Sequence, residues 1–405
     1  MELPVGTDRY RIMMIAPQPW FQPRGTPFSV LHRIKALTTL GHQVDLATYH
    51  VGQDVPMPGL RICRARPVPG IRRVKIGPSF AKVFLDAALY RRASAMLRQG
   101  RYDLLHTHEE AGFFGVGLAR RFRLPHLYDM HSSLPQQLSN FKFSRSKTLV
   151  AAFEALERRT ITTASAVITI CPELQHYVEA RFADQTSVLI ENVADNSIVF
   201  PADRSTQDEI RRNLALAGKR IVLYYGTLEP YQGISLLLES TAAMVAGGRT
   251  DVRVLIVGGH EEQVRSYRGQ VQSLRLGEYV HFTGFVPPQL IPSYIDLADV
   301  LVSTRKSGTN SPLKIYSYLR SGKPVVATDH ITHTQILTAQ VAYLAAAEPE
   351  PFATAVLQAL DNGDESRQKS QAAAQLAEER YGYQDYLNKT QWIVEQAVKN
   401  GPVLR

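Results

Sequence analysis

Short apolar runs alternate with helical patterns along most of this chain. The apolar runs are rich in β-branched and aromatic residues, and a helical pattern follows the first of them from about Phe28. The runs that we interpret as strands in the first half are 11–17, 43–49, 103–108, 126–131 and 166–171. Such alternation is typical of βαβ units with parallel strands. The pattern predicts an α/β protein.

The alternation stops near residue 200, in a polar segment without a clear period (192–209), and starts again at residue 220. The strands expected in the second half are 220–226, 252–259, 279–285, 298–304 and 323–328. We therefore predict two doubly wound domains, 1–198 and 199–380, with a ligand in the crevice outside the carboxyl ends of the strands.

The end of the chain, from Glu378 onward, is helical in pattern and rich in Gln, Glu and Lys. We treat 381–405 as a separate C-terminal helix. Its candidate anchoring residues are Tyr381, Tyr383, Tyr386, Trp392 and Ile393.

Composition restricts the class of protein. A chain of 405 residues with 44% apolar residues fits two ordinary domains. Cys63 and Cys171 are the only cysteines, which excludes a disulfide scaffold and a thiolate zinc cluster and fits a reducing compartment. Neither a signal peptide nor a run of about 18 apolar residues is found, so we expect a cytoplasmic protein.

The net charge of +9 makes an anionic partner plausible: a nucleotide, a phospholipid surface or nucleic acid. Nucleic acid is the weakest of these, because the positive charge is spread along the chain and no nucleic-acid motif occurs. We expect no nucleic-acid partner.

The loop after the first strand is the first candidate site. Thr26 and Pro27 form a good N-cap and first-turn pair, and Gly25 allows a ligand to approach the backbone. Free N–H groups at such a helix start can hold an anion. The alternative is a plain turn in which Trp20 and Phe21 only pack.

A second loop, residues 305–328, combines helix-capping residues with cations. We expect Ser311 to cap a helix that Pro312 opens, with N–H groups facing outward. The cationic side chains nearby are Arg305, Lys306 and Lys314. This combination suits a diphosphate, and the alternative is a solvated basic turn.

A third loop, at 224–240, contains Gly226 and Gly233 on either side of a turn. We expect it to lie beside the second loop at the same edge of the sheet. Alone it is a weak signal.

Three histidines lie at the ends of two strands. His131 follows Asp129 and precedes two serines, which favours a role in the site, whereas His106 is interpreted as a packing residue. His108 ends the same strand as His106.

At this point the sequence resembles glycosyltransferase family 4, the retaining GT-B enzymes. Each matching segment is weak alone, but their order is specific and covers nearly the whole chain. The segments are the loop at Gly25, 102–108, 128–132, 166–174, 189–196, 224–233, 254–259, 280–286 and 307–328.

The resemblance implies a GT-B fold: two Rossmann-like domains face each other across a cleft, and the C-terminal helix crosses back to the N-terminal domain. It implies a nucleotide-sugar donor, such as a UDP- or GDP-sugar, in the C-terminal domain and an acceptor in the N-terminal domain. The acceptor would be a glycan, a lipid-linked molecule or a small molecule. The implied reaction is hexosyl transfer with retention of anomeric configuration.

The resemblance also assigns roles to residues. His131 matches the family histidine at the reaction centre, and the backbone at Gly25 approaches the donor phosphates. The expected catalytic residues are His131, Lys314 and Arg305, and the expected acceptor-binding residues are His108 and Asp129. The expected donor-binding residues are Arg24, Gly25, Gly226, Thr227, Gln232, Gly284, Phe285, Val286, Thr309, Asn310, Ser311, Leu313 and Ser317.

This chain departs from the family where charge is usual. Two family glutamates are replaced by Thr309 and Ser317, and a family Arg and Lys by Thr227 and Gln232. Cations elsewhere would have to replace them: Arg24, Arg305 and Lys314.

No Asp-X-Asp pair ends a strand, so we expect neither a metal nor a cofactor, and helix N-termini and cations would stabilise the leaving group.

A last segment, 136–149, interleaves phenylalanines with basic residues. It could dock on an anionic bilayer and reach a lipid-linked acceptor, or it could be an ordinary surface loop.

Two other functions stay open: a non-catalytic sugar-nucleotide-binding scaffold, and another GT-B enzyme such as a nucleotide-sugar 2-epimerase. The sequence does not identify the sugar, the nucleotide, the acceptor or the oligomeric state.

Overall fold

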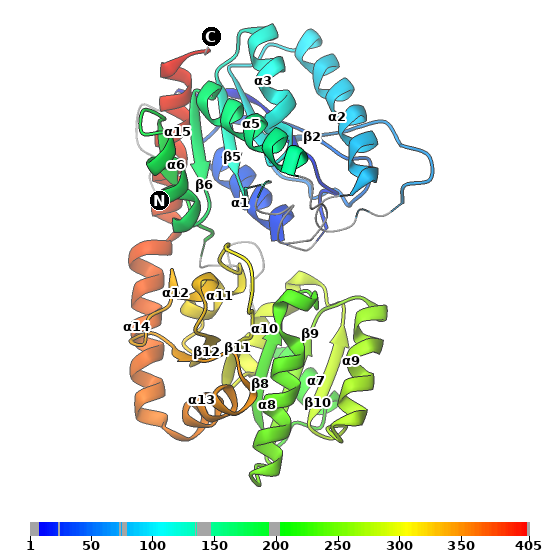
Figure 1. Ribbon diagram of the computed structural model, residues 1–405, viewed down its shortest axis with the longest axis vertical. Helices are drawn as coiled ribbons and strands as arrows, with labels where there is room; N and C mark the ends of the chain where they lie inside the picture. The colour runs from blue at the N-terminus through cyan, green and yellow to red at the C-terminus, as the bar shows by residue number, and fades with distance from the viewer. Residues whose placement is uncertain are drawn as a thin grey trace. The chain divides into compact units, whose positions relative to one another are not determined.

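The protein is described here by a computed structural model, in which the chain forms two compact units (Figure 1). Unit 1 comprises Met1–Asn192 and Gln384–Arg405, and unit 2 comprises Val193–Tyr383. The structure describes residues 8–22, 25–72, 74, 79–133, 135, 147–193 and 203–402. The boundaries predicted from the sequence are 198/199 and 380/381. Its assignment of acceptor and donor to the two domains stays a prediction.

The described part of unit 1 contains a seven-stranded sheet in the order β3-β2-β1-β4-β5-β6-β7. Every neighbouring pair is parallel. The strands are β1 (Arg11–Ala16), β2 (Gln43–Thr48), β3 (Leu60–Arg64), β4 (Leu104–His108), β5 (His126–Met130), β6 (Ala166–Thr169) and β7 (Ser187–Leu189). The strand order reverses between β1 and β4, where doubly wound sheets bind their ligands.

Helices cover this sheet. They are α1 (Gly25–Thr39), α2 (Phe80–Gln99), α3 (Ala111–Phe122), α5 (Lys147–Thr163), α6 (Pro172–Arg181) and α15 (Tyr383–Asn400). Leu85 and Leu89 of α2 and Leu118 of α3 pack against Met13 and Ile15 of β1. Met13 and Ile15 share a face because side chains alternate along a strand.

The described part of unit 2 contains a six-stranded parallel sheet in the order β10-β9-β8-β11-β12-β13. The strands are β8 (Arg220–Tyr225), β9 (Val252–Val257), β10 (Val280–Gly284), β11 (Val300–Ser303), β12 (Val325–Thr328) and β13 (Tyr343–Ala345). Here the order reverses between β8 and β11, so the carboxyl ends of these two strands mark the expected ligand edge.

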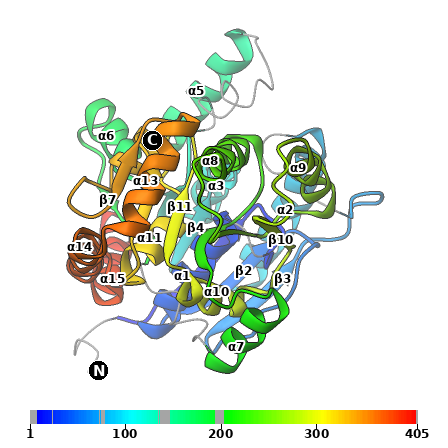
Figure 2. The same cartoon turned by 90° about the horizontal axis from the view of Figure 1, so that it is seen from below.

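Two groups of helices cover the two faces of the second sheet. One face packs against α8 (Ile234–Ala246), α9 (Glu261–Ser273) and α13 (Pro349–Asp361). The other face packs against α7 (Arg204–Asn213), α10 (Ile291–Leu297), α11 (Lys314–Arg320) and α14 (Gly363–Tyr381). Short elements complete the unit: η2 (Pro230–Gln232), η3 (Pro288–Leu290) and α12 (Ile331–Thr334). Helices α8 and α13 lie side by side (Figure 2).

The predicted α/β architecture is confirmed, and all ten predicted strands form. Three further strands, β3, β7 and β13, were not predicted. Each is short and lies at an edge of its sheet, with neighbours on one side only. Such strands lack the long apolar run of a strand buried on both faces.

Both predicted helix caps are wrong. Helix α1 begins at Gly25, one residue before the expected cap, and the Thr26 hydroxyl donates to Glu109 Oε1 at 3.1 Å. Helix α11 begins at Lys314, and the Ser311 hydroxyl is buried without a hydrogen-bond partner among the described residues.

The C-terminal segment contacts unit 1 as expected, through α15, where Tyr386 and Ile393 are buried. Two expected anchors differ. Trp392 is 44% exposed, and the Tyr381 ring packs on Tyr316 in unit 2. In the described part of the chain, no helix is both long and apolar enough to cross a membrane.

Candidate functional site

A buried polar cluster lies at the carboxyl ends of β4 and β5 in unit 1. His106 and His108 lie on the same side of β4, and the parallel register places His108 opposite Asp129 of β5. His131 follows β5 directly. The cluster is close-packed, since the rings of His106 and His108 stack with centroids 4.6 Å apart and all four side chains are buried.

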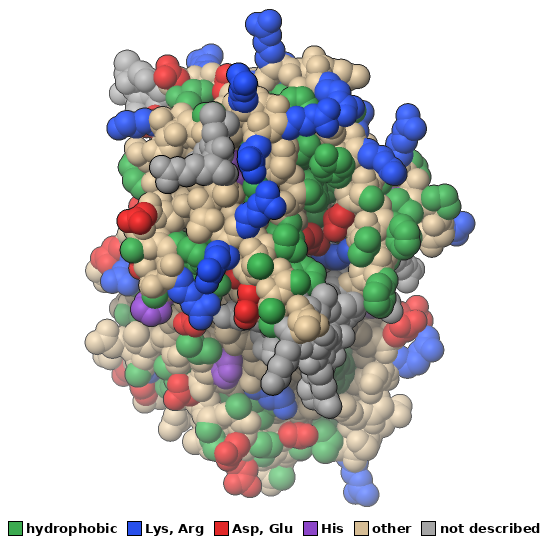
Figure 3. Space-filling view, turned by 45° about the horizontal axis from the view of Figure 1, so that its top comes forward, with side chains coloured by type: hydrophobic (Ala, Val, Ile, Leu, Met, Phe, Trp, Pro, Cys, Tyr) green, Lys and Arg blue, Asp and Glu red, His purple; other side chains and the backbone are tan. Residues whose placement is uncertain are grey.

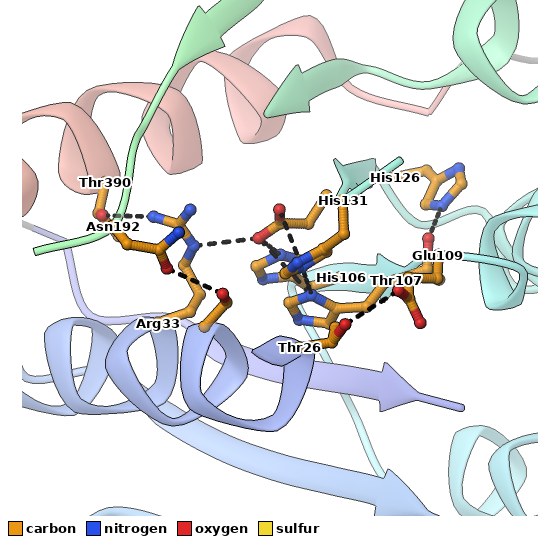
Figure 4. Close-up of polar contacts among 12 residues, drawn as sticks. Thr26, Arg33, His106, Thr107, Glu109, His126, His131, Asn192 and Thr390 are labelled. Atoms are coloured by element: carbon orange, nitrogen blue, oxygen red, sulfur yellow. Dashed lines mark hydrogen bonds and ion pairs between the residues drawn. The ribbon is translucent and has the colours of Figure 1, made fainter. Parts of the chain in front are cut away.

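Asp129 is the centre of this cluster, and Figure 4 labels three of the residues that contact it, Arg33, His106 and His131. Its Oδ2 lies 3.1 Å from Arg33 Nε, and its Oδ1 lies 3.3 Å from His131 Nε2. The Oδ2 atom is also 3.4 Å from His106 Nε2 and 3.6 Å from His108 Nδ1. Burial opposes ionisation of this carboxyl, but Arg33 and the histidines hold its pKa well below its ordinary value.

The three histidines complete the network around the carboxylate. Burial is the largest cause that lowers the pKa of His106, and it lowers the pKa of His108 further. His108 Nδ1 and His131 Nε2 are 2.9 Å apart, so one ring donates a hydrogen bond to the other. His131 Nε2 therefore lies next to both His108 Nδ1 and Asp129 Oδ1.

These positions bear on three predictions. His106 is buried as expected, but it belongs to the cluster through its contacts with His108 and Asp129. The side chains of His108 and Asp129 are fully buried and contact other protein groups. Their predicted contact with an acceptor stays a prediction.

The same cluster has the composition of a metal site, because ligand atoms of His106, His108 and Asp129 lie within 4.8 Å of one another. Arg33, however, contacts the Asp129 carboxylate and brings a positive charge to it. A divalent cation bound to Asp129 would be repelled by this guanidinium. The residues present therefore fit a network of hydrogen bonds and ion pairs among side chains better than a metal site.

A group of carboxyl side chains beyond β4 was missed by the sequence analysis. Glu109 has a left-handed backbone (φ 49°), which is uncommon for a residue other than glycine. Lys82 Nζ contacts Glu110 Oε1 at 2.6 Å, and the Tyr49 hydroxyl donates to Asp86 at 2.5 Å. Burial, aided by Glu110, raises the pKa of Asp86 to about 7. Glu109 and Glu110 directly follow the buried strand β4, and this acidic pair is the feature of the sequence that could have indicated the group.

In unit 2, glycine turns meet at the carboxyl edge of the sheet. Gly226 follows β8, and the Gly258 N–H donates to the carbonyl of Gly284 at 2.9 Å. A Cβ atom on Gly258 would lie 2.2 Å from the Gly226 carbonyl oxygen, so only glycine allows this approach. The predicted donor residues Gly226 and Gly284 are thereby brought to one edge, with Phe285 and Val286 following.

Lys314 lies directly beneath the Gly226 turn. Its ammonium is 3.6 Å from the centroid of the Tyr224 ring, and a Cβ atom on Gly226 would lie 3.1 Å from it. The amine is buried and has no hydrogen-bond partner among the described residues. Burial, aided by Arg305, lowers its pKa well below the ordinary value. A buried amine without an anion is costly and marks a candidate functional site.

Arg305 holds the second loop together. Its guanidinium donates to the carbonyls of Ser307 and Asn310 at 3.1 and 3.0 Å and lies over the Tyr231 ring. The third loop is tied to it, since the Thr304 hydroxyl donates to the carbonyl of Gln232 at 2.9 Å.

The remaining predicted donor residues occupy varied positions. Gln232 Nε2 lies 3.4 Å from the Thr227 hydroxyl, and the Thr309 carbonyl accepts from Gln335. Ser317 is buried on α11, one turn after Leu313. Arg24 lies outside the described residues.

Two family profiles match the chain. The profile of the glycosyl transferase 4-like domain matches residues 24–192, and that of the glycosyl transferases group 1 matches residues 206–376. Together they span both sheets. The chain belongs to the family 4 glycosyltransferases. Members of this family transfer a sugar from a nucleotide-sugar donor, and this glycosyltransferase does the same.

Curated relatives of this glycosyltransferase are distant but match its length. The phosphatidyl-myo-inositol mannosyltransferase of Mycobacterium leprae is 25% identical over 402 residues, which cover 96% of this chain and 98% of the relative. The D-inositol 3-phosphate glycosyltransferase of Thermomonospora curvata is 26% identical over 330 residues, or 75% of each chain.

Solved structures confirm the GT-B fold of this glycosyltransferase. Sucrose-phosphate synthase from Thermosynechococcus elongatus superimposes with a TM-score of 0.79 and 19% identity, covering 96% of this chain and 99% of that one. Anabaena HepE, solved in complex with UDP and glucose, gives a TM-score of 0.74 and 16% identity, covering 96% and 100%.

Replacing Lys314 by Met should stabilise the fold. The variant keeps the length of the side chain and removes a buried, unpartnered amine, so we expect the free energy of unfolding to rise by about 1–3 kcal/mol. Denaturant titration at neutral pH measures this.

The pH dependence provides a second check. The folded pKa of Lys314 is lowered, so the unfolded chain binds more protons between that value and the ordinary 10.5. In this window the stability of the wild type should rise with pH relative to K314M. Lys306→Met, which changes an exposed lysine of the same loop, is the control. A destabilised K314M protein would show that the amine has a protein partner.

Proposed function

We propose that this glycosyltransferase is a retaining, metal-independent hexosyltransferase in which unit 2 holds the donor diphosphate and unit 1 holds the acceptor near His131. The observation that carries the proposal is the Lys314 amine, which lies under the Gly226 turn without an anionic partner in the described part of the chain. A diphosphate would supply the missing negative charge.

Lys314 also fits the departures from the family pattern. Thr227, Gln232, Thr309 and Ser317 are neutral where family members usually carry charge. A cation at the glycine turn can take over part of their task, because stabilising the departing diphosphate is the main electrostatic requirement of the reaction. Arg305 would act beside it, holding the loop around the diphosphate.

The proposed chemistry needs little else from the protein. As the bond between the anomeric carbon and the diphosphate oxygen breaks, positive charge develops on the sugar. The acceptor oxygen bonds to the anomeric carbon from the same face and gives its proton to the departing diphosphate, which gives retention. His131 would contact the transferring sugar or the acceptor. Its ring is fixed by His108 and Asp129, so it can present one orientation to the substrate.

A thermal-shift panel tests the donor assignment. One of the UDP-, GDP-, ADP- or TDP-sugars should raise the melting temperature of the wild type, because a ligand that binds only the folded state stabilises it. K314M should lose most of this shift, and its turnover should fall roughly a hundredfold. Lys306→Met should keep both.

Each other outcome has a definite meaning. A donor-induced shift without turnover on any acceptor would favour the non-catalytic scaffold. Release of a free, epimerised sugar nucleotide without an acceptor would identify a 2-epimerase. Unchanged turnover in K314M would exclude Lys314 as the group that stabilises the diphosphate.

We further propose a lipid-linked acceptor and peripheral contact with the cytoplasmic face of a membrane. The name of the mycobacterial relative, a phosphatidyl-myo-inositol mannosyltransferase, points to such an acceptor. The first turns of α2 expose Phe80, Val83 and Phe84, which are 80%, 63% and 64% accessible. These positions share one face of the helix, and the exposed Arg91 lies further along it.

This exposed face can insert apolar side chains beside anionic headgroups. On the side visible in Figure 3, Lys and Arg side chains are spread among hydrophobic and acidic ones. The sequence also predicts membrane contact for the segment 136–149. Residues 136–146 of this segment lie outside the described residues. This contact stays a prediction.

Vesicle co-sedimentation tests the membrane contact. Changing both Phe80 and Phe84 to Ser should weaken binding to vesicles containing anionic lipid at least tenfold, since each buried phenylalanine contributes about 2 kcal/mol. Phe285→Ser, which removes an exposed phenylalanine of unit 2, is the control. Equal binding of all three proteins would exclude α2 as the contact.

A further inference from the structure

Helix α1 binds both segments through which the chain leaves and re-enters unit 1. The Ser29 hydroxyl donates to Asn192 Oδ1 at 2.8 Å, and Asn192 is the last residue of the first segment of unit 1. One turn later, Arg33 Nη1 donates to the Thr390 hydroxyl of α15 at 2.9 Å. All these side chains are buried, and Figure 4 shows the contact between Arg33 and Thr390.

Arg33 is also fixed by two further contacts. Its guanidinium carbon lies 4.8 Å from the ring centroid of Tyr386 on α15, within cation–π range. Its Nε contacts Asp129 Oδ2 at 3.1 Å, and both side chains are almost completely buried. Arg33 therefore connects α15 directly to the carboxylate at the centre of the histidine cluster.

The connection continues to His131, because the other oxygen of Asp129 lies 3.3 Å from His131 Nε2. A buried charged group stays close to its partner, because separating the two would leave an unpaired charge away from water and strongly destabilise the protein. A change in the position of α15 would thus move Arg33, then Asp129, and finally the imidazole.

Packing alone would attach α15 to unit 1. Ile393, Val394 and Ala397 are fully buried, and Gln391 makes a separate polar contact with His42 at 3.2 Å. A buried ion pair is a weak source of stability compared with apolar side chains of the same size. The Arg33 contacts therefore call for a role other than attachment.

We propose that Arg33 is a positioning residue for His131, and that Thr390 and Tyr386 of α15 set its position, so that the C-terminal helix forms part of the catalytic apparatus. This rests on the proposed function of His131. The C-terminal helix then controls the rate of sugar transfer, in addition to completing the fold of unit 1.

Matched variants on α15 separate positioning from attachment. Thr390→Val removes the hydroxyl that accepts from Arg33 but keeps the shape, and Gln391→Met removes the contact with His42 without touching the cluster. We expect T390V to lower kcat roughly tenfold with an unchanged KM for the donor, because the lost bond involves a charged group. Thr390→Ser should restore kcat to near the wild-type value, and Q391M should retain it.

A spectroscopic readout makes the test independent of turnover. The ring ¹⁵N signals of His131, assigned by their loss in His131→Asn, report its tautomer and hydrogen bonds. T390V and Arg33→Met should shift these signals, whereas Q391M should not. If the wild type transfers no sugar, the proposed function fails, but these signals still test the connection.

Two results would overturn the proposal. One is an equal loss of kcat in T390V and Q391M, in proportion to their loss of stability. The other is an unchanged His131 signal in folded T390V, which decides the matter even if Arg33→Met does not fold.

Discussion

The parallel pairing of β4 with β5 is the constraint on which the candidate site of unit 1 depends. Its register sets His108 beside Asp129 and brings His106 to the same side. A shift by one residue would turn these side chains to the opposite face of the sheet, because the side-chain period of a strand is two. Strands β1 and β6 flank this pair, and all their residues except Arg11 are buried, so these two strands help to keep this register in place.

The two units differ in whether a buried ionisable group has a partner of opposite charge among the described residues. In unit 1 the Asp129 carboxylate is paired with Arg33 and surrounded by histidines, so its charge is balanced within the protein. In unit 2 the Lys314 amine is next to an aromatic ring and a glycine turn, and among the described residues no anion balances it. The first arrangement fixes geometry, and the second is the basis of the proposal that unit 2 binds a negatively charged substrate.

Sequence patterns predicted the strands of both cores and the clustering of Gly226 and Lys314 at one edge, because these follow from local periodicity and from parallel pairing. They failed for the caps at Thr26 and Ser311, which depend on how the chain enters each helix. They could not reveal the contact of Arg33 with Thr390. These residues are 357 positions apart, and an arginine within an apolar helical pattern carries no local sign of a buried partner.

The departures from the family pattern gain a physical meaning from Lys314. Neutral residues at 309 and 317 remove two negative charges that would repel a diphosphate, and neutral residues at 227 and 232 remove two positive charges that would bind it. A lysine whose pKa is lowered by burial can bind such a ligand only by taking up a proton, unless it is already charged. Donor binding and protonation are then linked, and affinity falls as pH rises through the pKa of the bound state. In this glycosyltransferase, one buried amine would thus replace the cations that family members usually carry at 227 and 232.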